Sequence, residues 1–212
     1  MIIKSFPTGP YLTNAYVFAC EHTHHAAIID PAPGSFPLIK EFLQAEALNC
    51  KYILLTHSHW DHIADVKVMK EFYHIPVYVH LLDAPNLIQP GSDGLPIRMH
   101  IDGVQPDFYL EDQMNFQIGL LNLRVIYTPG HSPGGVCFFD PDNHVLFTGD
   151  TLFKGCIGNL TFPTCEPAKM WPSLEKLILL PSKTVVYPGH GMATTMEREV
   201  DWLKRTIALE NH

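Results

Sequence analysis

Short apolar runs that end in turns rich in glycine, proline or aspartate recur along this 212-residue chain. Runs of this kind, wholly apolar or alternating between apolar and polar positions, are typical of β-strands. They predict strands over residues 14–20, 26–30, 52–55, 75–79, 116–118, 121–128, 136–139, 144–148 and 184–187. Apolar residues at helical spacing predict helices over residues 36–48, about 61–72 and 196–209. Strands and helices are therefore mixed along the whole chain.

Residues 81–108 interrupt this pattern. Prolines and glycines recur there, from Pro85 to Pro106, and predict a long loop. Long loops inside compact domains are often functional or mobile. We expect this loop to overhang the functional site.

The composition narrows the class of protein. Hydrophobic residues make up 46% of the chain and charged residues 17%, which is typical of a globular protein. The length fits one large domain or two small ones, and we interpret residues 1–212 as a single domain. The formal net charge of −8 argues against a nucleic-acid partner. No apolar run approaches the roughly 20 residues of a membrane span, and the first residues lack a signal-peptide layout, so we expect no membrane partner. The sequence leaves the oligomeric state open.

The five cysteines are odd in number and show no C-x-x-C pairing. This arrangement predicts neither a disulfide framework nor a zinc site built from cysteines. We therefore expect free thiols and a cytoplasmic location.

The densest group of chemically capable side chains lies in Thr56-His57-Ser58-His59-Trp60-Asp61-His62, directly after the apolar run 52–55. Imidazole nitrogen and carboxylate oxygen are ligands that suit zinc and other borderline divalent metals. Positions i and i+2 of an extended chain share a face, so His57 and His59 can point the same way. Four such side chains are too many for one tetrahedral site that keeps an open position. The cluster therefore predicts two metals.

Histidines elsewhere have a plainer interpretation. His22, His24 and His25 lie in the turn between two expected strands, and an exposed hairpin is a poor metal site. We interpret them as a solvated turn. His80 follows a short strand alone and is interpreted as a hydrogen-bonding wall.

Three later strands each end at a single ligand-type residue in a glycine-rich turn. These residues are His131, Asp150 and His190, and a glycine precedes each of them. Glycine allows the backbone to bend sharply and to approach closely there. A buried aspartate at a strand end is costly unless a positive charge meets it, which a metal pair supplies. We expect these strand ends to converge with the first cluster at one edge of a sheet.

Taken together, these motifs resemble the metallo-β-lactamase superfamily. The matching stretches are residues 57–62, 129–134, 149–153 and 188–191, in the family's order and with its rough spacing. The Gly149-Asp150-Thr151-Leu152-Phe153 stretch and the overall length are most similar to the short glyoxalase II-like hydrolases.

The resemblance implies an α/β fold, the αβ/βα four-layer sandwich, in which two mixed sheets lie face to face with helices outside. It implies that one metal is held by His57, His59 and His131, that the other is held by Asp61, His62 and His190, and that Asp150 bridges them. Asp30 matches the family's carboxylate that orients a metal ligand. Taken from the residues alone, Asp30 is either such a group or a surface cap.

The implied activity is that of a dinuclear-metal hydrolase whose small-molecule substrate is a thioester of the hydroxyacylglutathione type. Two metals about 3.5–4 Å apart can share a water and lower its pKa toward ~7. We expect the resulting bridging hydroxide to attack the acyl carbonyl, with Asp61 helping to handle the proton. Zinc is the first choice for both ions, and iron or manganese also suit these ligands.

Two departures from the glyoxalase II pattern bear on the substrate. That pattern runs Gly-Arg-x-Asp shortly after the 149–153 stretch, whereas Asn159, Leu160 and Thr161 follow Gly158 here. Glyoxalase II proteins also carry a helical C-terminal extension that forms part of the glutathione site, and the residues after His190 leave room for one helix.

Other functions of the superfamily compete with thioester hydrolysis. A lactonase or another metallo-hydrolase acting on a cyclic substrate would use the same ligands. An iron-dependent persulfide dioxygenase would need fewer of them. A metal-binding regulatory module would be favoured by a broken ligand set, and all seven positions are intact.

Overall fold

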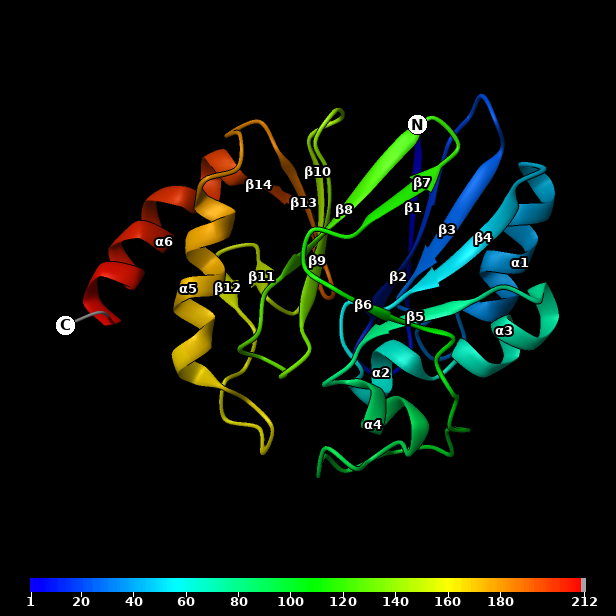
Figure 1. Ribbon diagram of the computed structural model, residues 1–212, viewed down its shortest axis with the longest axis horizontal. Helices are drawn as coiled ribbons and strands as arrows, with labels where there is room; N and C mark the ends of the chain where they lie inside the picture. Colours follow the sequence, from blue (N-terminus) through cyan, green and yellow to red (C-terminus); the bar gives the residue numbers. More distant parts are fainter. Residues whose placement is uncertain (211–212) are drawn as a thin grey trace.

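The computed structural model describes residues 1–210, in which two mixed β-sheets form the centre of the molecule (Figure 1). The first sheet has the strand order β1-β2-β3-β4-β5-β6, and the second has the order β14-β13-β10-β9-β8-β7. The first comprises β1 (Ile2–Thr8), β2 (Thr13–Ala19), β3 (His25–Ile29), β4 (Asn49–Leu54), β5 (Val77–His80) and β6 (Phe108–Leu110). The second comprises β7 (Asn115–Ile118), β8 (Leu121–Tyr127), β9 (Val136–Asp140), β10 (Val145–Gly149), β13 (Val185–Pro188) and β14 (Thr194–Thr195). A small hairpin joins β11 (Leu152–Phe153) to β12 (Cys156–Ile157).

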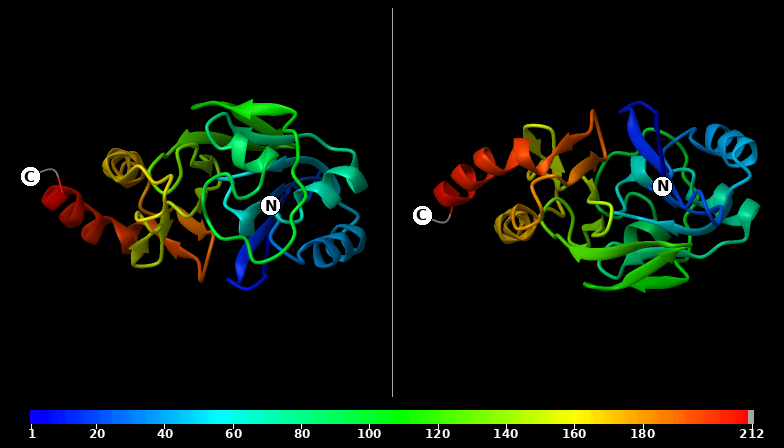
Figure 2. Two further views of the ribbon diagram at one scale, coloured as in Figure 1. Left: turned by 90° about the horizontal axis from the view of Figure 1, so that it is seen from below. Right: turned by 90° about the horizontal axis from the view of Figure 1, so that it is seen from above.

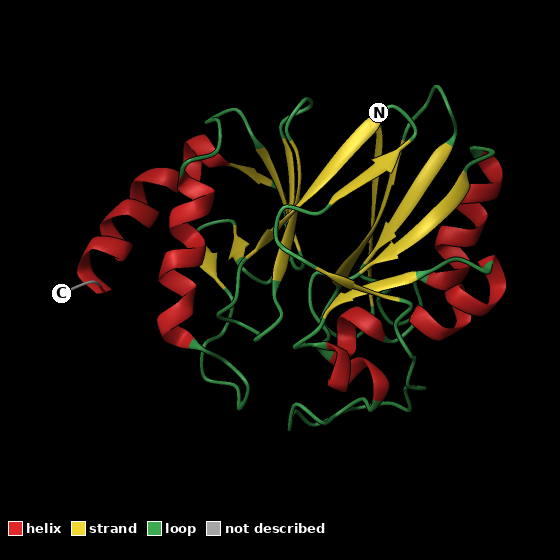
Figure 3. Ribbon diagram, in the orientation of Figure 1, coloured by secondary structure: helices red, strands yellow, loops and turns green. Residues whose placement is uncertain are grey.

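Helices cover the outer faces of both sheets, as Figures 2 and 3 show. The helices of the described chain are α1 (Phe36–Ala45), α2 (Trp60–Ile63), α3 (Val66–Tyr73), α4 (Ala84–Ile88), α5 (Pro167–Ile178) and α6 (Met196–Glu210). The short helices α2 and α4 lie at one edge of the sheets (Figure 1). Helices α1 and α3 pack on the first sheet, and α5 and α6 pack on the second. Within residues 1–210, none of these helices has both the length and the apolar character needed to cross a membrane.

The alternation of side chains along β2 shows how the layers are held together. Val17 belongs to the apolar cluster under α1 and α3, whereas Tyr16 and Phe18 point into the cluster between the two sheets. This period of two is what a strand buried on both faces requires. Phe147 of β10 meets both Tyr16 and Phe18 from the opposite sheet, with ring centroids 5.2 and 5.7 Å apart. The αβ/βα sandwich expected from the sequence is confirmed.

Several element boundaries differ from the predictions. The helix expected over 36–48 ends at Ala45, because Ala47 adopts a left-handed conformation with φ +51°. The single helix expected after the histidine cluster is two helices, α2 and α3. The expected loop 81–108 contains the short helix α4, and β1 was not predicted.

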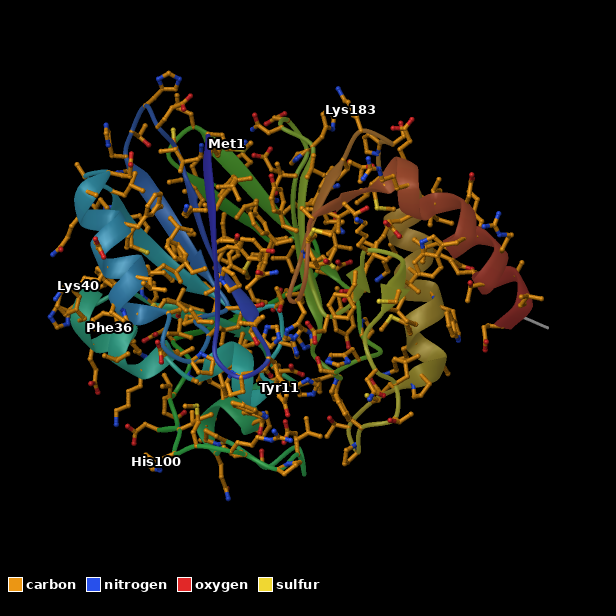
Figure 4. The ribbon with its side chains drawn as sticks, turned by 180° about the vertical axis from the view of Figure 1, so that it is seen from behind. Met1, Tyr11, Phe36, Lys40, His100 and Lys183 are labelled. Carbon is orange, nitrogen blue, oxygen red and sulfur yellow. The ribbon has the colours of Figure 1, made fainter. Side chains whose placement is uncertain are left out.

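The turns that follow β3, β4, β8, β10 and β13 lie at one edge of the sandwich. Strands β3 and β4 pair in parallel, as do β10 and β13, so their carboxyl ends point the same way. Ligand sites in α/β folds form beyond such strand ends. Figure 4 places Tyr11 at this edge, with Met1 and Lys183 at the opposite end of the molecule.

Candidate metal centre

The turn after β4 brings four of the predicted ligands to the edge. His59 has extended backbone angles (φ −57°, ψ 144°) and precedes α2, which carries Asp61 and His62. His57, His59, Asp61 and His62 are all buried. A strand, an extended turn and one short helix therefore place them together, as the sequence predicted.

The other three candidates arrive from the second sheet through tight glycine turns. Gly149 has φ +48°, and a Cβ atom there would lie 2.3 Å from Thr56 Oγ1. Gly130 is also left-handed, and a Cβ atom there would lie 2.7 Å from the backbone of Met170. Only glycine fits such close approaches. These turns bring His131, Asp150 and His190 into contact with His59, His62 and Asp61 respectively.

The structure brings all seven residues into one cluster with two halves. The potential ligand atoms of His57, His59 and His131 lie within 4.8 Å of one another, and so do those of Asp61, His62 and His190. We call the first group the three-histidine set and the second the mixed set.

Asp150 lies between the two sets. Its Oδ2 is 3.4 Å from Nε2 of His131 and 3.4 Å from Nε2 of His190, and its Oδ1 is 3.4 Å from Nε2 of His62. A tetrahedral ion with bonds of about 2.0–2.1 Å separates neighbouring ligands by about 3.4 Å. The spacing around Asp150 therefore suits ions on both sides of it.

Unpartnered atoms in the cluster supply a second test of fit. His59 Nε2, His62 Nε2, His131 Nε2 and Asp150 Oδ1 are buried and have no hydrogen-bond partner. Buried polar atoms are almost always paired, so four orphaned atoms in one cluster indicate a missing partner. Nitrogen and oxygen lone pairs facing a common space are what a divalent cation binds. The residues present fit a dinuclear metal site.

The ionisation of the cluster points the same way. Burial lowers the pKa of His57 well below its ordinary value and lowers the pKa of His59 to about 3, so both rings offer neutral lone pairs at pH 7. Burial also opposes charge on His62, but the carboxylates of Asp61 and Asp150 raise its pKa well above the usual range. Although burial opposes ionisation of Asp150, the charge of His62 holds the pKa of that carboxyl well below normal. In the metal-free cluster a proton on His62 supplies the positive charge that these buried carboxylates need, and a divalent ion would take the place of that proton.

Residues outside the seven orient the ligand rings. Asp30 Oδ2 lies 3.0 Å from His62 Nδ1, and its two oxygens accept the Thr56 N–H and hydroxyl at 2.7 and 2.5 Å. The carbonyl of Asn159 lies 2.8 Å from His131 Nδ1. In each case the remaining Nε2 faces the cluster, as metal-binding histidines require. The structure therefore gives Asp30 the orienting position and not that of a surface cap.

Thr13 was missed by sequence reasoning. Its hydroxyl donates to Asp61 Oδ2 at 2.6 Å, and its backbone pairs with His190. The neighbouring Asn14 side chain donates to the carbonyls of Pro188 and Gly191 at 3.0 Å each and so secures the His190 turn. In the sequence, both residues stand at the start of an expected strand. Thr13 is 48 residues from Asp61, and no local pattern around it predicts that contact.

The expected overhang by residues 81–108 is also present. Leu95 and Pro96 line a cavity of about 480 Å³ beside the cluster. Tyr11, Trp60 and Phe162 complete its apolar wall. Trp60, which stands among the ligands in the sequence, is thus part of the wall of this cavity.

At Gly158–Thr161, where the glyoxalase II pattern has an arginine and an acid, a different set of hydrogen bonds holds the loop. Asn159 Oδ1 accepts the N–H and the hydroxyl of Thr161 at 2.8 and 2.7 Å. This small turn stabilises the loop without an arginine and an acid. The same loop supplies the Asn159 carbonyl to His131.

Histidines expected to lie outside the site do so. His22 and His24 are exposed in their turn, and His80 stacks on Tyr127 with ring centroids 4.5 Å apart. Neither group belongs to a ligand set found in the described part of the chain.

Comparisons with known proteins identify the family. The model of the metallo-beta-lactamase superfamily matches residues 8–190, and the chain belongs to that superfamily. The "Probable metallo-hydrolase YqgX" of Bacillus subtilis is 32% identical over 93% of this chain and 94% of its own length. A hydroxyacylglutathione hydrolase of Francisella tularensis subsp. novicida is 31% identical over 90% of this chain and 68% of its own length. The protein is thus similar to metal-dependent hydrolases along nearly its whole length.

Solved structures agree with the fold. The "BLEG-1 B3 metallo-beta-lactamase" is 35% identical and superimposes with a TM-score of 0.87 over 94% of this chain and 97% of its own. The protein TTHA1623 "in a di-iron-bound form" is 35% identical with a TM-score of 0.80 over 93% of this chain and 97% of its own. The fold and the His/Asp cluster are therefore those of a metallo-hydrolase superfamily.

Proposed function

We propose that this protein is a dinuclear-metal hydrolase of thioesters. One ion is held by His57, His59 and His131, the other by Asp61, His62 and His190, with Asp150 shared between them. The position of Asp150 carries this proposal, because its two oxygens lie 3.4 Å from ring nitrogens of both sets. Asp61 and Asp150 are the carboxylates that we assign to catalysis.

Different residues bind the metals, accept the proton and limit the access of water. When bound, a pair of divalent ions lowers the pKa of a shared water and polarises the scissile carbonyl. Thr13 keeps Asp61 Oδ2 turned into the cluster, where that oxygen can accept the proton released by the nucleophile. Tyr11, Trp60 and Phe162 wall one side of the site with apolar surface, which limits access of bulk water.

A thioester suits this site because a thiolate leaves with little help from a general acid. The Francisella relative supports hydroxyacylglutathione as the substrate type. Zinc is our first choice for the metals, and the di-iron form of TTHA1623 supports iron as the alternative. A cytoplasmic location is supported by cysteines that are all free in the described chain.

Hydrolysis of a cyclic substrate, a lactone or a β-lactam, is the second candidate. The observation in its favour is the similarity to BLEG-1, which covers 97% of that protein. The ligand geometry serves both reactions, so the substrate itself decides between them.

The test is hydrolysis of lactoylglutathione by metal-loaded protein, with thioesters of simple thiols, a lactone and a β-lactam alongside. We expect thioester turnover that is lost when the metals are removed. Turnover of the cyclic substrates alone would overturn the thioesterase proposal and favour the second candidate. Equal turnover of all thioesters would show that glutathione is not recognised.

A further inference from the structure

Asp83 connects two turns of the metal centre without belonging to either ligand set. It follows β5 at the start of α4, and its side chain is buried. Asp83 Oδ2 accepts the backbone N–H of Ser58 at 2.8 Å, and Oδ1 accepts the N–H of Gly134 at 2.6 Å. Ser58 stands between His57 and His59, and Gly134 follows His131 by three residues. One carboxylate therefore joins the two turns that supply the three-histidine set.

The close fit around Asp83 shows that the bridge is built into both turns. A Cβ atom on Gly134 would lie 2.6 Å from Asp83 Oδ1, so only glycine admits the carboxylate there. The two turns are also joined at their strand side, where Val136 N donates to the Thr56 carbonyl at 2.8 Å. Asp83 joins the same two turns at the side that carries the histidines, through Ser58 and Gly134.

The adjoining segment holds Ser58 from its carbonyl as well. Asn86 Nδ2 donates to Ser58 O at 2.5 Å and to Asp93 Oδ2 at 2.9 Å. Both polar backbone groups of Ser58 are thus bound by side chains of residues 83 and 86. The segment 81–108 thus contributes twice to the site. Its Leu95 and Pro96 line the cavity, and its Asp83 and Asn86 hold the turn that carries His57 and His59.

The mixed set has different supports. His62 is oriented by Asp30, and Asp61 is oriented by Thr13. The hydrogen bonds of Asp83 go to Ser58 and Gly134 and reach neither of these supports. The Asp30 support is shared, because the Thr56 hydroxyl that donates to Asp30 also lies 3.1 Å from Nδ1 of His57. Asp83, by contrast, contacts only the two turns that carry the three-histidine set.

We propose that Asp83 is a positioning residue that sets the affinity for the ion held by His57, His59 and His131. It does so by fixing the separation of the two turns. This inference rests on the ligand assignment under the proposed function. Removing a group that orients metal ligands typically weakens metal binding about 10–100-fold.

The experiment is a zinc titration of metal-free full-length protein against a chromophoric chelator, for the wild type and Asp83→Asn. Asparagine keeps the shape of the side chain but replaces one acceptor oxygen by a donor that faces an N–H group. We expect two ions in the wild type, and in the variant one ion bound about 10–100-fold more weakly while the other is unchanged. NMR of the imidazole nitrogens then shows which histidines have lost the ion, and we expect these to be His57, His59 and His131.

Asp140→Asn is the matched control. Asp140 is also a buried aspartate that accepts backbone N–H groups, those of Asp142 and Asn143 at 3.0 Å each, but it lies at the other end of β10 from Asp150. We expect it to lower thermal stability and leave both zinc affinities unchanged. Equal weakening of both ions in Asp83→Asn would indicate a general structural role and overturn the inference, as would unchanged affinities.

Two further outcomes are decisive. If Asp83→Asn does not fold, Asn86→Ala leaves Asp83 in place and removes the bond to the Ser58 carbonyl, together with the bonds of Asn86 to Gly91 and Asp93 within its own segment. Weaker binding at the three-histidine set supports the inference in that variant, and unchanged binding contradicts it. A wild-type protein that binds fewer than two ions overturns both this inference and the proposed function, whereas two ions with unaltered affinities in a folded Asp83→Asn overturn this inference alone.

Discussion

Asp30 Oδ2 lies 3.0 Å from Nδ1 of His62, and both side chains are completely enclosed by the protein. This contact sets the orientation of the imidazole, because the ring must then present Nε2 to Asp61 and Asp150, 3.6 and 3.4 Å away. Asp30 itself is held by the N–H and hydroxyl of Thr56, at the end of the neighbouring strand. A parallel strand pair thus aims one ring nitrogen at the centre of the site.

We expect Asp30→Asn to weaken binding of the ion in the mixed set by about 10–100-fold, because the amide cannot satisfy both Thr56 and His62. Zinc titration followed by chelator competition measures the change. Asp142→Asn, on an exposed turn, is the control and should bind as the wild type does. Undiminished affinity in folded Asp30→Asn would show that the contact does not position the ligand.

Asp150→Ala removes the carboxylate that faces both sets. The two groups of ligands then lose their shared member, so we expect weaker binding of both ions and a loss of kcat of at least about 100-fold. Metal analysis after dialysis and a steady-state assay measure the two effects. Two tightly bound ions together with full activity in this variant would contradict the bridging role.

Thr13→Val should show whether Thr13 acts by orienting Asp61 or only by packing. Valine matches threonine in shape but cannot donate to Asp61 Oδ2, which now receives a hydrogen bond at 2.6 Å. We expect kcat/KM to fall about 10-fold, roughly the effect of one lost hydrogen bond to a charged group. Thr13→Ser retains the hydroxyl and should restore most of the activity. Equal losses in both variants would assign Thr13 a packing role only.

Glu199 links the C-terminal helix α6 to the hairpin beside the site. Its two oxygens accept the Gly155 N–H at 2.9 Å and the Thr194 hydroxyl and Trp202 indole at 2.5 Å each. We expect Glu199→Gln to lower the free energy of unfolding by about 1–3 kcal/mol, since one amide oxygen cannot replace two carboxylate oxygens. Thermal or denaturant unfolding measures this loss, and Glu197→Gln on the exposed face of α6 is the control. Equal stabilities of the two variants would refute the role.

The seven clustered residues were predictable because each carries a local pattern. His57 to His62 form a dense motif, and His131, Asp150 and His190 each follow a glycine at a strand end. The sequence order of these patterns matches a known family, which supplied the pairing into two sets. The packing of the strands then follows from alternation, as β2 shows.

The supporting residues could not be predicted in the same way. Asp83 and Thr13 act across 51 and 48 residues of sequence, and each stands in a stretch that reads as ordinary loop or strand. Their roles depend on which backbone groups face them in three dimensions. The end of α1 was also predicted wrongly, because the left-handed backbone of Ala47 stops the helix and the residue type does not reveal that conformation.

The most direct measurement is thioester hydrolysis by metal-free protein as zinc is added in known equivalents. The dinuclear assignment predicts that activity with lactoylglutathione, or with a simple thioester, rises to a plateau at two equivalents of metal. Activity that is already complete without metal would contradict the account. So would a protein that binds two ions yet hydrolyses no thioester.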